Sequence, residues 1–111
     1  MTRLSTATRV SALLRRVHAA GGSAMVLARG DAMGGGILVQ LVERGADARF
    51  VERGIGADGE TVLIATGPSD ADSQAVDAYW QRRRSYDPDL WVIELDVPDG
   101  ERFAAETILD A

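Results

Sequence analysis

Four short segments rich in apolar and β-branched residues follow one another in the first two-thirds of the chain, separated only by glycine-containing turns. They cover residues 24–29, 37–43, 49–53 and 61–66. Segments of this length and composition predict β-strands, and consecutive strands with short links favour an antiparallel meander. We therefore predict a four-stranded antiparallel meander in which residues 30–36 form a flexible hairpin loop.

An amphipathic helix is predicted before these strands. Apolar residues recur there with the spacing of one helix face, at Val10, Leu13, Leu14 and Val17. Ser5 and Thr6 are candidate N-caps, and the pattern runs to about Ala20, where Gly21 ends it.

A second helix is predicted to begin at Pro68-Ser69-Asp70 and to end before Pro88, because a residue that precedes proline avoids the α conformation. Residues 90–97 predict a fifth strand, and residues 101–111 fit a short helix better than a hairpin strand. The expected fold class is α+β, with an N-terminal helix, the meander, a second helix, a fifth strand and a short C-terminal element. These elements form a single domain over residues 1–111.

The composition excludes several kinds of chemistry. The chain has no cysteine, no lysine and one histidine, His18, so disulfides, thiolate-bound metals, Schiff bases and a P-loop lysine are all excluded. The net charge of −5 weakens long-range attraction to nucleic acids. The sequence has neither a signal peptide nor an apolar run of about 18 residues, so we expect a cytoplasmic protein. We expect no catalytic residue, no metal and no cofactor.

Three glycine or acidic motifs resemble ligand-binding patterns. Residues 54–59 match the dinucleotide pattern G-x-G-x-x-G, but that pattern must open a helix and a strand is predicted next, which favours a hairpin. Residues 30–36 lack the lysine of a P-loop and predict a mobile turn. Asp70-Ala71-Asp72 lacks the glycine and glutamate of a calcium loop, and we assign it to helix capping.

The order of elements is similar to the core of metal-dependent nucleases, which hold magnesium with clustered carboxylates. The available carboxylates are Asp31, Glu43, Glu52, Asp89, Glu94 and Asp96. No spacing brings three of them together, so a magnesium-dependent hydrolase is an alternative that rests on fold analogy.

Arginines alternate with aromatic and acidic residues near the end of the second predicted helix. The candidate binding residues are Trp80, Arg82, Arg83, Arg84, Tyr86, Asp87 and Asp89. Such a cluster can bind phosphates and stack on bases. A structural role is favoured, because arginines stabilise a helix C-terminus and Asp87 and Asp89 are adjacent ion-pair candidates. Arg83 lies within the apolar stripe, about one turn after Trp80, and therefore needs a carboxylate or carbonyl partner.

Several segments together resemble a known family. They are residues 10–17, Arg29-Gly30-Asp31, Arg82-Arg83-Arg84 and residues 87–94, which end in Trp-Val-Ile-Glu. With them the chain resembles the alphaproteobacterial family called domain of unknown function 1491, over most of its length. The resemblance implies a stand-alone bacterial protein of about this size and carries over no activity, cofactor or catalytic residue.

The preferred hypothesis is a non-enzymatic binding or protein-interaction module, because no complete catalytic motif is present. The sheet must have edge strands that need a partner or a cover, so we also expect a homodimer or another protein partner. Nucleic-acid binding through Arg82, Arg83 and Arg84 is a second hypothesis, and we expect no membrane partner.

Overall fold

The computed structural model describes residues 4–69 and 72–109, and it confirms the predicted α+β class and the order of the elements. The elements are α1 (Thr6–Ala19), β1 (Ser23–Ala28), β2 (Ile37–Glu43), β3 (Ala46–Ile55), β4 (Thr61–Thr66), α2 (Ser73–Tyr86), β5 (Trp91–Asp96) and α3 (Gly100–Ile108). The C-terminal segment therefore contains a helix, as favoured. Helix α2 begins later than predicted, at Ser73 with Asp72 as its N-cap, and Asp70 lies outside the described residues.

The five strands form one mixed sheet in the order β1-β5-β2-β3-β4. The predicted meander is correct for β2, β3 and β4, whereas β1 does not pair with β2 because β5 lies between them. Strand β5 is antiparallel to β1 and parallel to β2. The sequence of β5 explains its central place: Trp91, Val92 and Ile93 are a continuous apolar run, which suits a strand covered on both faces.

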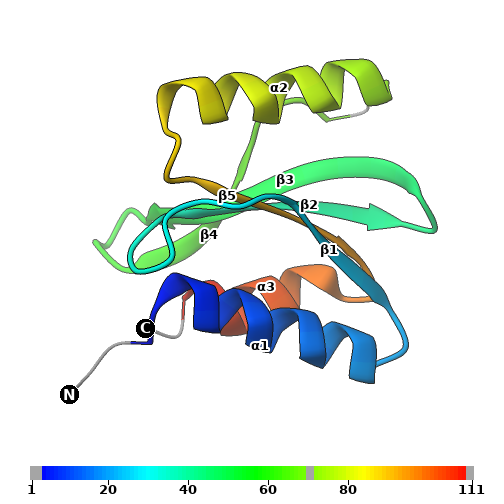
Figure 1. The fold of residues 1–111 in the computed structure, drawn as a ribbon, viewed down its shortest axis with the longest axis horizontal. Coiled ribbons are helices and arrows are strands. Elements are labelled where there is room, and N and C mark those ends of the chain that lie inside the picture. Colours follow the sequence, from blue (N-terminus) through cyan, green and yellow to red (C-terminus); the bar gives the residue numbers. More distant parts are fainter. Residues whose placement is uncertain (1–3, 70–71, 110–111) are drawn as a thin grey trace.

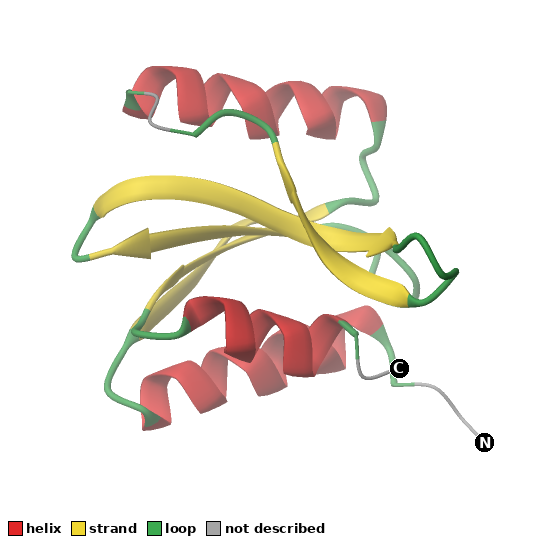
Figure 2. Ribbon diagram, turned by 180° about the vertical axis from the view of Figure 1, so that it is seen from behind, coloured by secondary structure: helices red, strands yellow, loops and turns green. Residues whose placement is uncertain are grey.

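Helices cover both faces of the sheet (Figures 1 and 2). Helices α1 and α3 lie side by side on one face, and α2 lies alone on the other. Alternate residues of the strands consequently belong to two separate cores. Phe50 contributes to the core under α2 and Val51 to the core under α1 and α3, as the alternation in β3 predicts.

Residues 30–36 form a packed crossover rather than the flexible hairpin loop that the sequence predicts. Because β5 separates β1 from β2, this segment must pass over the beginning of β5. An added Cβ at Gly30 or Gly35 would overlap the carbonyl oxygen of Asp89, so both positions need glycine for this close approach. The crossover is also tied to α1, since Thr6 N and Ala7 N donate to the carbonyl oxygens of Met33 and Ala32 at 3.2 and 2.9 Å.

Trp91 joins the crossover to the core. Its side chain is fully buried, and its indole Nε1 donates to the carbonyl oxygen of Asp31 at 2.7 Å. The guanidinium of Arg29 stacks over the ring, 4.9 Å from its centroid. The backbone amide of Trp91 donates to the carbonyl oxygen of Gly36 at 2.9 Å, so one residue anchors both ends of the crossover. No helix within residues 4–69 and 72–109 is long and apolar enough to span a membrane.

Candidate functional site

Arg83 is held by a carboxylate from the sheet. Its two terminal nitrogens donate to the two carboxylate oxygens of Glu52 at 2.7 and 2.9 Å, and one of them also donates to the Tyr79 hydroxyl at 2.8 Å. The pair is partly buried, with side-chain exposures of 33% for Arg83 and 18% for Glu52. The predicted need for a partner is met, but by Glu52 of β3 and not by the adjacent Asp87 or Asp89. The sequence could not supply this partner, because it lies 31 residues away on a different layer.

The ion pair shifts the titration of both groups. Hydrogen bonds from Arg83 lower the pKa of Glu52 below its ordinary value of 4.5, against an opposing effect of burial. The same bonds raise the pKa of Arg83 above its already high ordinary value. The pair therefore joins α2 to the sheet, and each charged group is already hydrogen-bonded to the other.

Replacing Arg83 by methionine is expected to lower the free energy of unfolding at neutral pH by about 1–2 kcal/mol, because Glu52 loses a bidentate partner. A carboxyl whose pKa is lowered in the folded state stabilises the fold above its unfolded pKa, and this contribution disappears as pH falls through the folded pKa. The difference between wild type and Arg83→Met should thus shrink below about pH 4. Urea denaturation across pH measures it.

Arg82→Met is the matched control, because Arg82 is the adjacent arginine and makes no side-chain hydrogen bond within the described part of the chain. It should change the free energy of unfolding by less than about 0.5 kcal/mol. Equal losses for the two variants would contradict the structural role of the Arg83 pair.

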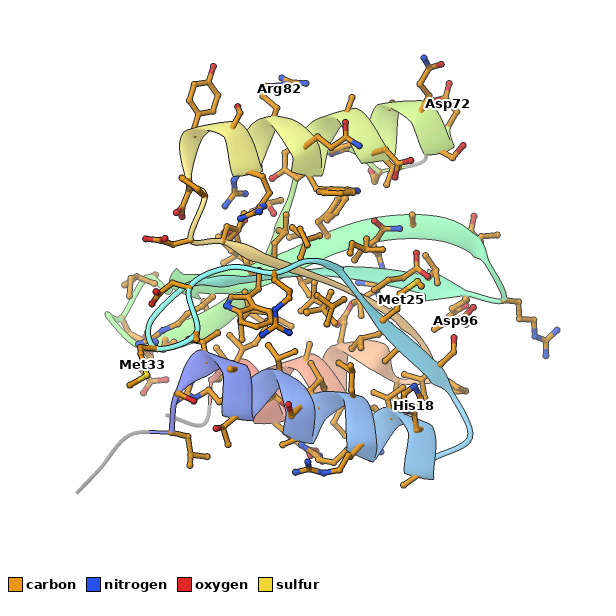
Figure 3. The ribbon with its side chains drawn as sticks, viewed as in Figure 1. His18, Met25, Met33, Asp72, Arg82 and Asp96 are labelled. Carbon is orange, nitrogen blue, oxygen red and sulfur yellow. The ribbon has the colours of Figure 1, made fainter. Side chains whose placement is uncertain are left out.

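The remaining cluster residues mostly close the end of α2. Arg84 donates to the carbonyl oxygens of Pro88 and, at 3.2 Å, Leu90, and Asp87 Oδ1 accepts from the amide of Asp89 at 3.1 Å. Trp80 packs on the core and its indole donates to Asp77 at 3.3 Å. Arg82, Tyr86 and Asp89 are exposed, and no side-chain hydrogen bond joins them to the rest of the described chain; Figure 3 shows Arg82 pointing away from the sheet. The cluster thus forms the C-terminal end of α2, and two of its three arginines, Arg83 and Arg84, donate hydrogen bonds within the protein.

The carboxylates considered for magnesium do not come together as a metal site. Glu52 pairs with Arg83, Asp31 Oδ2 accepts from the amides of Met33 and Gly34, and Asp96 accepts from the amides of Arg44 and Gly45 at 2.9 Å. Arg44 and Gly45 have positive φ values of 52° and 77°, as a tight two-residue hairpin turn requires. The two hydrogen bonds to Asp96 hold this β2–β3 turn in place. Among the residues described, no three histidine, aspartate or glutamate side chains are grouped to hold a metal ion.

Neither glycine-rich motif is arranged as a phosphate loop. Residues 54–59 lead from β3 through a turn into β4, with Gly56 N donating to the carbonyl oxygen of Glu60 at 2.7 Å, as the hairpin interpretation expects. The crossover at residues 30–36 supplies carbonyl oxygens to the first amides of α1. The donors that would bind a phosphate at that helix end are consequently occupied.

The two edges of the sheet differ in how they are protected. Strand β1 has a register shift between Val26 and Ala28, and His18 Nε2 lies 3.2 Å from the carbonyl oxygen of Ala24. Figure 3 shows His18 beside this edge. Strand β4 pairs with β3 in unbroken register, and its sequence, Thr-Val-Leu-Ile-Ala-Thr, has no charge and no proline. Natural sheets protect their edge strands with bulges, charged residues, prolines or a covering segment. Strand β4 has no bulge, no charge and no proline, so we call it the open edge.

Apolar side chains accompany this open edge. We define the β4 edge as Thr61–Thr66 together with Ile55 at the end of β3. Ile64 is 38% exposed and covers Gly54, while Ile55 is 71% exposed. The uncharged composition of this segment is visible in the sequence, but its position at an edge is not, because the strand order depends on where β5 inserts.

The comparison with known proteins places this geometry in a family. A model of the family described as "Protein of unknown function (DUF1491)" matches residues 4–105. The chain belongs to this family. The resemblance noted from the arginine run and the Trp-Val-Ile-Glu segment is therefore confirmed.

Solved structures of DUF1491 proteins share the fold. A crystal structure of a family member from Caulobacter crescentus CB15 is 37% identical, covers 91% of this chain and 94% of that chain, and has a TM-score of 0.77. An NMR structure from the same organism is 36% identical, with 93% and 94% covered and a TM-score of 0.75. The solution structure of protein Atu0922 from A. tumefaciens is 27% identical, with 97% and 93% covered and a TM-score of 0.68. No curated protein matches the sequence.

Proposed function

We propose that this DUF1491 protein is a non-enzymatic protein-interaction module that pairs with a second copy of itself through the β4 edge. The observation that carries the proposal is the contrast between the two edge strands, which are both uncharged: β1 has a register shift and a contact from His18, whereas β4 is regular and unbroken. An edge strand of this kind adds a further strand through its free amides and carbonyls. We also infer that it acts in the cytoplasm, since the chain contains no cysteine for disulfides.

A two-fold arrangement fits the sequence of β4. An antiparallel pair of identical strands can centre on Ile64, which then faces Ile64 of the second copy. Leu63 would face Ala65 on the opposite side of the sheet, and Val62 would face Thr66. No like charges meet in this register, which matters for two chains that each carry a net charge of −5.

Charge placed on the β4 edge should abolish the dimer. We expect the wild-type protein to dimerise at micromolar to high-micromolar concentration in sedimentation velocity, and Ile64→Lys to remain monomeric, because two lysines would face each other in the paired strand. Far-UV circular dichroism verifies that the variant folds, and Ile64 is exposed enough for this change.

Met25→Lys is the matched control, since Met25 is an exposed apolar residue on the other edge strand. It should dimerise like wild type. A monomeric wild-type protein at high-micromolar concentration would refute the homodimer. If Met25→Lys alone dissociated the dimer, the interface would lie at β1 and not at β4.

The two alternatives have less support from the site. Nucleic-acid binding relied on Arg82, Arg83 and Arg84, of which Arg83 and Arg84 are bonded within the protein. A magnesium-dependent hydrolase needs carboxylates grouped as metal ligands, and the described residues form no such group. We therefore base the proposal on the sheet edge.

A further inference from the structure

A second feature lies away from β4, in a cavity between the beginning of α2 and the sheet. Its volume is about 390 Å³, within the range of small-ligand sites, and its walls come from β2, β3, β5 and α2. Three of its lining residues are carboxylates, Asp47, Asp77 and Glu94, while the other polar side chains are Gln40 and Ser73. The described lining contains no arginine, so the cavity is acidic.

Glu94 is one of the lining carboxylates and has no cationic partner among the described residues. It is partly buried on β5, and Gln40 Nε2 donates to its Oε2 at 3.2 Å. None of the ion pairs formed by the described residues includes it. Burial raises the pKa of Glu94, and the negative charges of Asp96 and Asp77 raise it further. A partly buried carboxylate with acidic neighbours is an unfavourable arrangement that a cation would relieve.

Gln40 provides the second, independent observation. Its side chain lines the same cavity, the residue is only 6% exposed, and its Oε1 has no hydrogen-bond partner within the described chain. An unpartnered buried acceptor is costly, and native proteins rarely retain one without a ligand, water or ion to satisfy it. Gln40 and Glu94 lie directly opposite each other on the parallel strands β2 and β5, so the amide and the carboxylate lie side by side in one wall of the cavity.

We propose that this cavity binds an organic cation with N–H donors, a primary ammonium or a guanidinium. An ammonium group has three donors and no acceptor, which matches carboxylate oxygens of Glu94 and Asp77 together with Gln40 Oε1. A metal ion fits less well, because no three acidic or histidine side chains in residues 4–69 and 72–109 are placed as metal ligands. The site is independent of the proposed dimer, since β4 contributes nothing to its lining.

Nuclear magnetic resonance can test the site with a simple probe. Titration with n-butylammonium should shift the backbone amide signals of Gln40 and Glu94 and the indole signal of Trp80, whose N–H donates to Asp77. Neutral n-butanol and tetramethylammonium, which lacks N–H donors, should leave these signals in place. Equal shifts with n-butanol or tetramethylammonium, or no shift with n-butylammonium, would overturn the proposal.

Matched variants locate the binding. Glu94→Gln and, separately, Asp77→Asn should each weaken n-butylammonium binding at least about tenfold, corresponding to roughly 1.4 kcal/mol. Glu60→Gln makes the same change of charge in the exposed β3–β4 turn and should bind like wild type. Glu94→Gln should fold normally, because glutamine has the shape of glutamate and its side-chain oxygen can still accept from Gln40 Nε2. Undiminished binding by both cavity variants would refute the assignment.

One further titration distinguishes the source of the cation. A short lysine-containing peptide that displaces n-butylammonium with higher affinity would assign the site to a basic side chain of a partner protein. A peptide that does not compete would assign it to a free amine. Either result supports an ammonium site, and the oligomeric state of Ile64→Lys remains a separate test of the dimer.

Discussion

Truncating Trp91 to alanine is expected to lower the free energy of unfolding by about 3–5 kcal/mol, because the ring is the largest fully buried side chain among the described residues. The loss has two parts. A cavity remains at the beginning of β5, and the indole hydrogen bond to Asp31 that secures the crossover disappears. Urea denaturation followed by far-UV circular dichroism measures the change without relying on tryptophan fluorescence.

Trp91→Phe separates these contributions. Phenylalanine keeps most of the apolar ring but cannot donate to Asp31, so we expect a smaller loss of about 2 kcal/mol. The carbonyl oxygen of Asp31 would still accept from Gly35 N at 3.3 Å. If phenylalanine and alanine were equally destabilising, ring packing would contribute little, contrary to the complete burial of Trp91.

Gly35→Ala is the second substitution with a large expected effect, at about 3 kcal/mol of unfolding free energy. The added Cβ would overlap the carbonyl oxygen of Asp89, which is backbone and itself accepts a hydrogen bond from Asp31 N at 3.0 Å. Neither partner can move without opening the contact between the crossover and β5. Chemical denaturation measures the loss.

Gly34→Ala provides the control from the neighbouring position in the same crossover. An added Cβ there meets nothing closer than Asp31 Oδ2 at 4.0 Å, so its effect should stay within about 0.5 kcal/mol. If both glycines tolerated alanine, residues 30–36 would be the mobile turn that their composition predicts, and the packed crossover would be wrong.

The local features of the sequence predict the elements well, because they depend on neighbouring residues. The alternation and β-branching of β2 and β4 place both strands at the observed bounds, and the stripe from Val10 to Val17 places α1. The position of β5 could not be predicted in the same way. Its insertion between β1 and β2 depends on packing between segments more than 50 residues apart, as the pair Gln40 and Glu94 illustrates.

The candidate sites also combine local features that the sequence predicts with long-range contacts that it does not. Arg83 could be singled out, because an arginine on an apolar stripe needs a partner, but Glu52 could not be chosen without the sheet order. The glycines at 30 and 35 were visible, yet their reason is a contact with Asp89 that exists only once β5 is in place. Gln40 is a polar residue within the apolar strand β2, and only the pairing of β2 with β5 sets it beside Glu94.

The late position of β5 in the chain also affects how the protein is made. During synthesis β1 and β2 leave the ribosome early, yet the strand that joins them is complete only with Asp96. Until then the hairpins of β2, β3 and β4 can form, but β1 and α1 have no sheet to complete. The sheet can therefore be completed only after β5 has emerged, however early β1 and β2 are made.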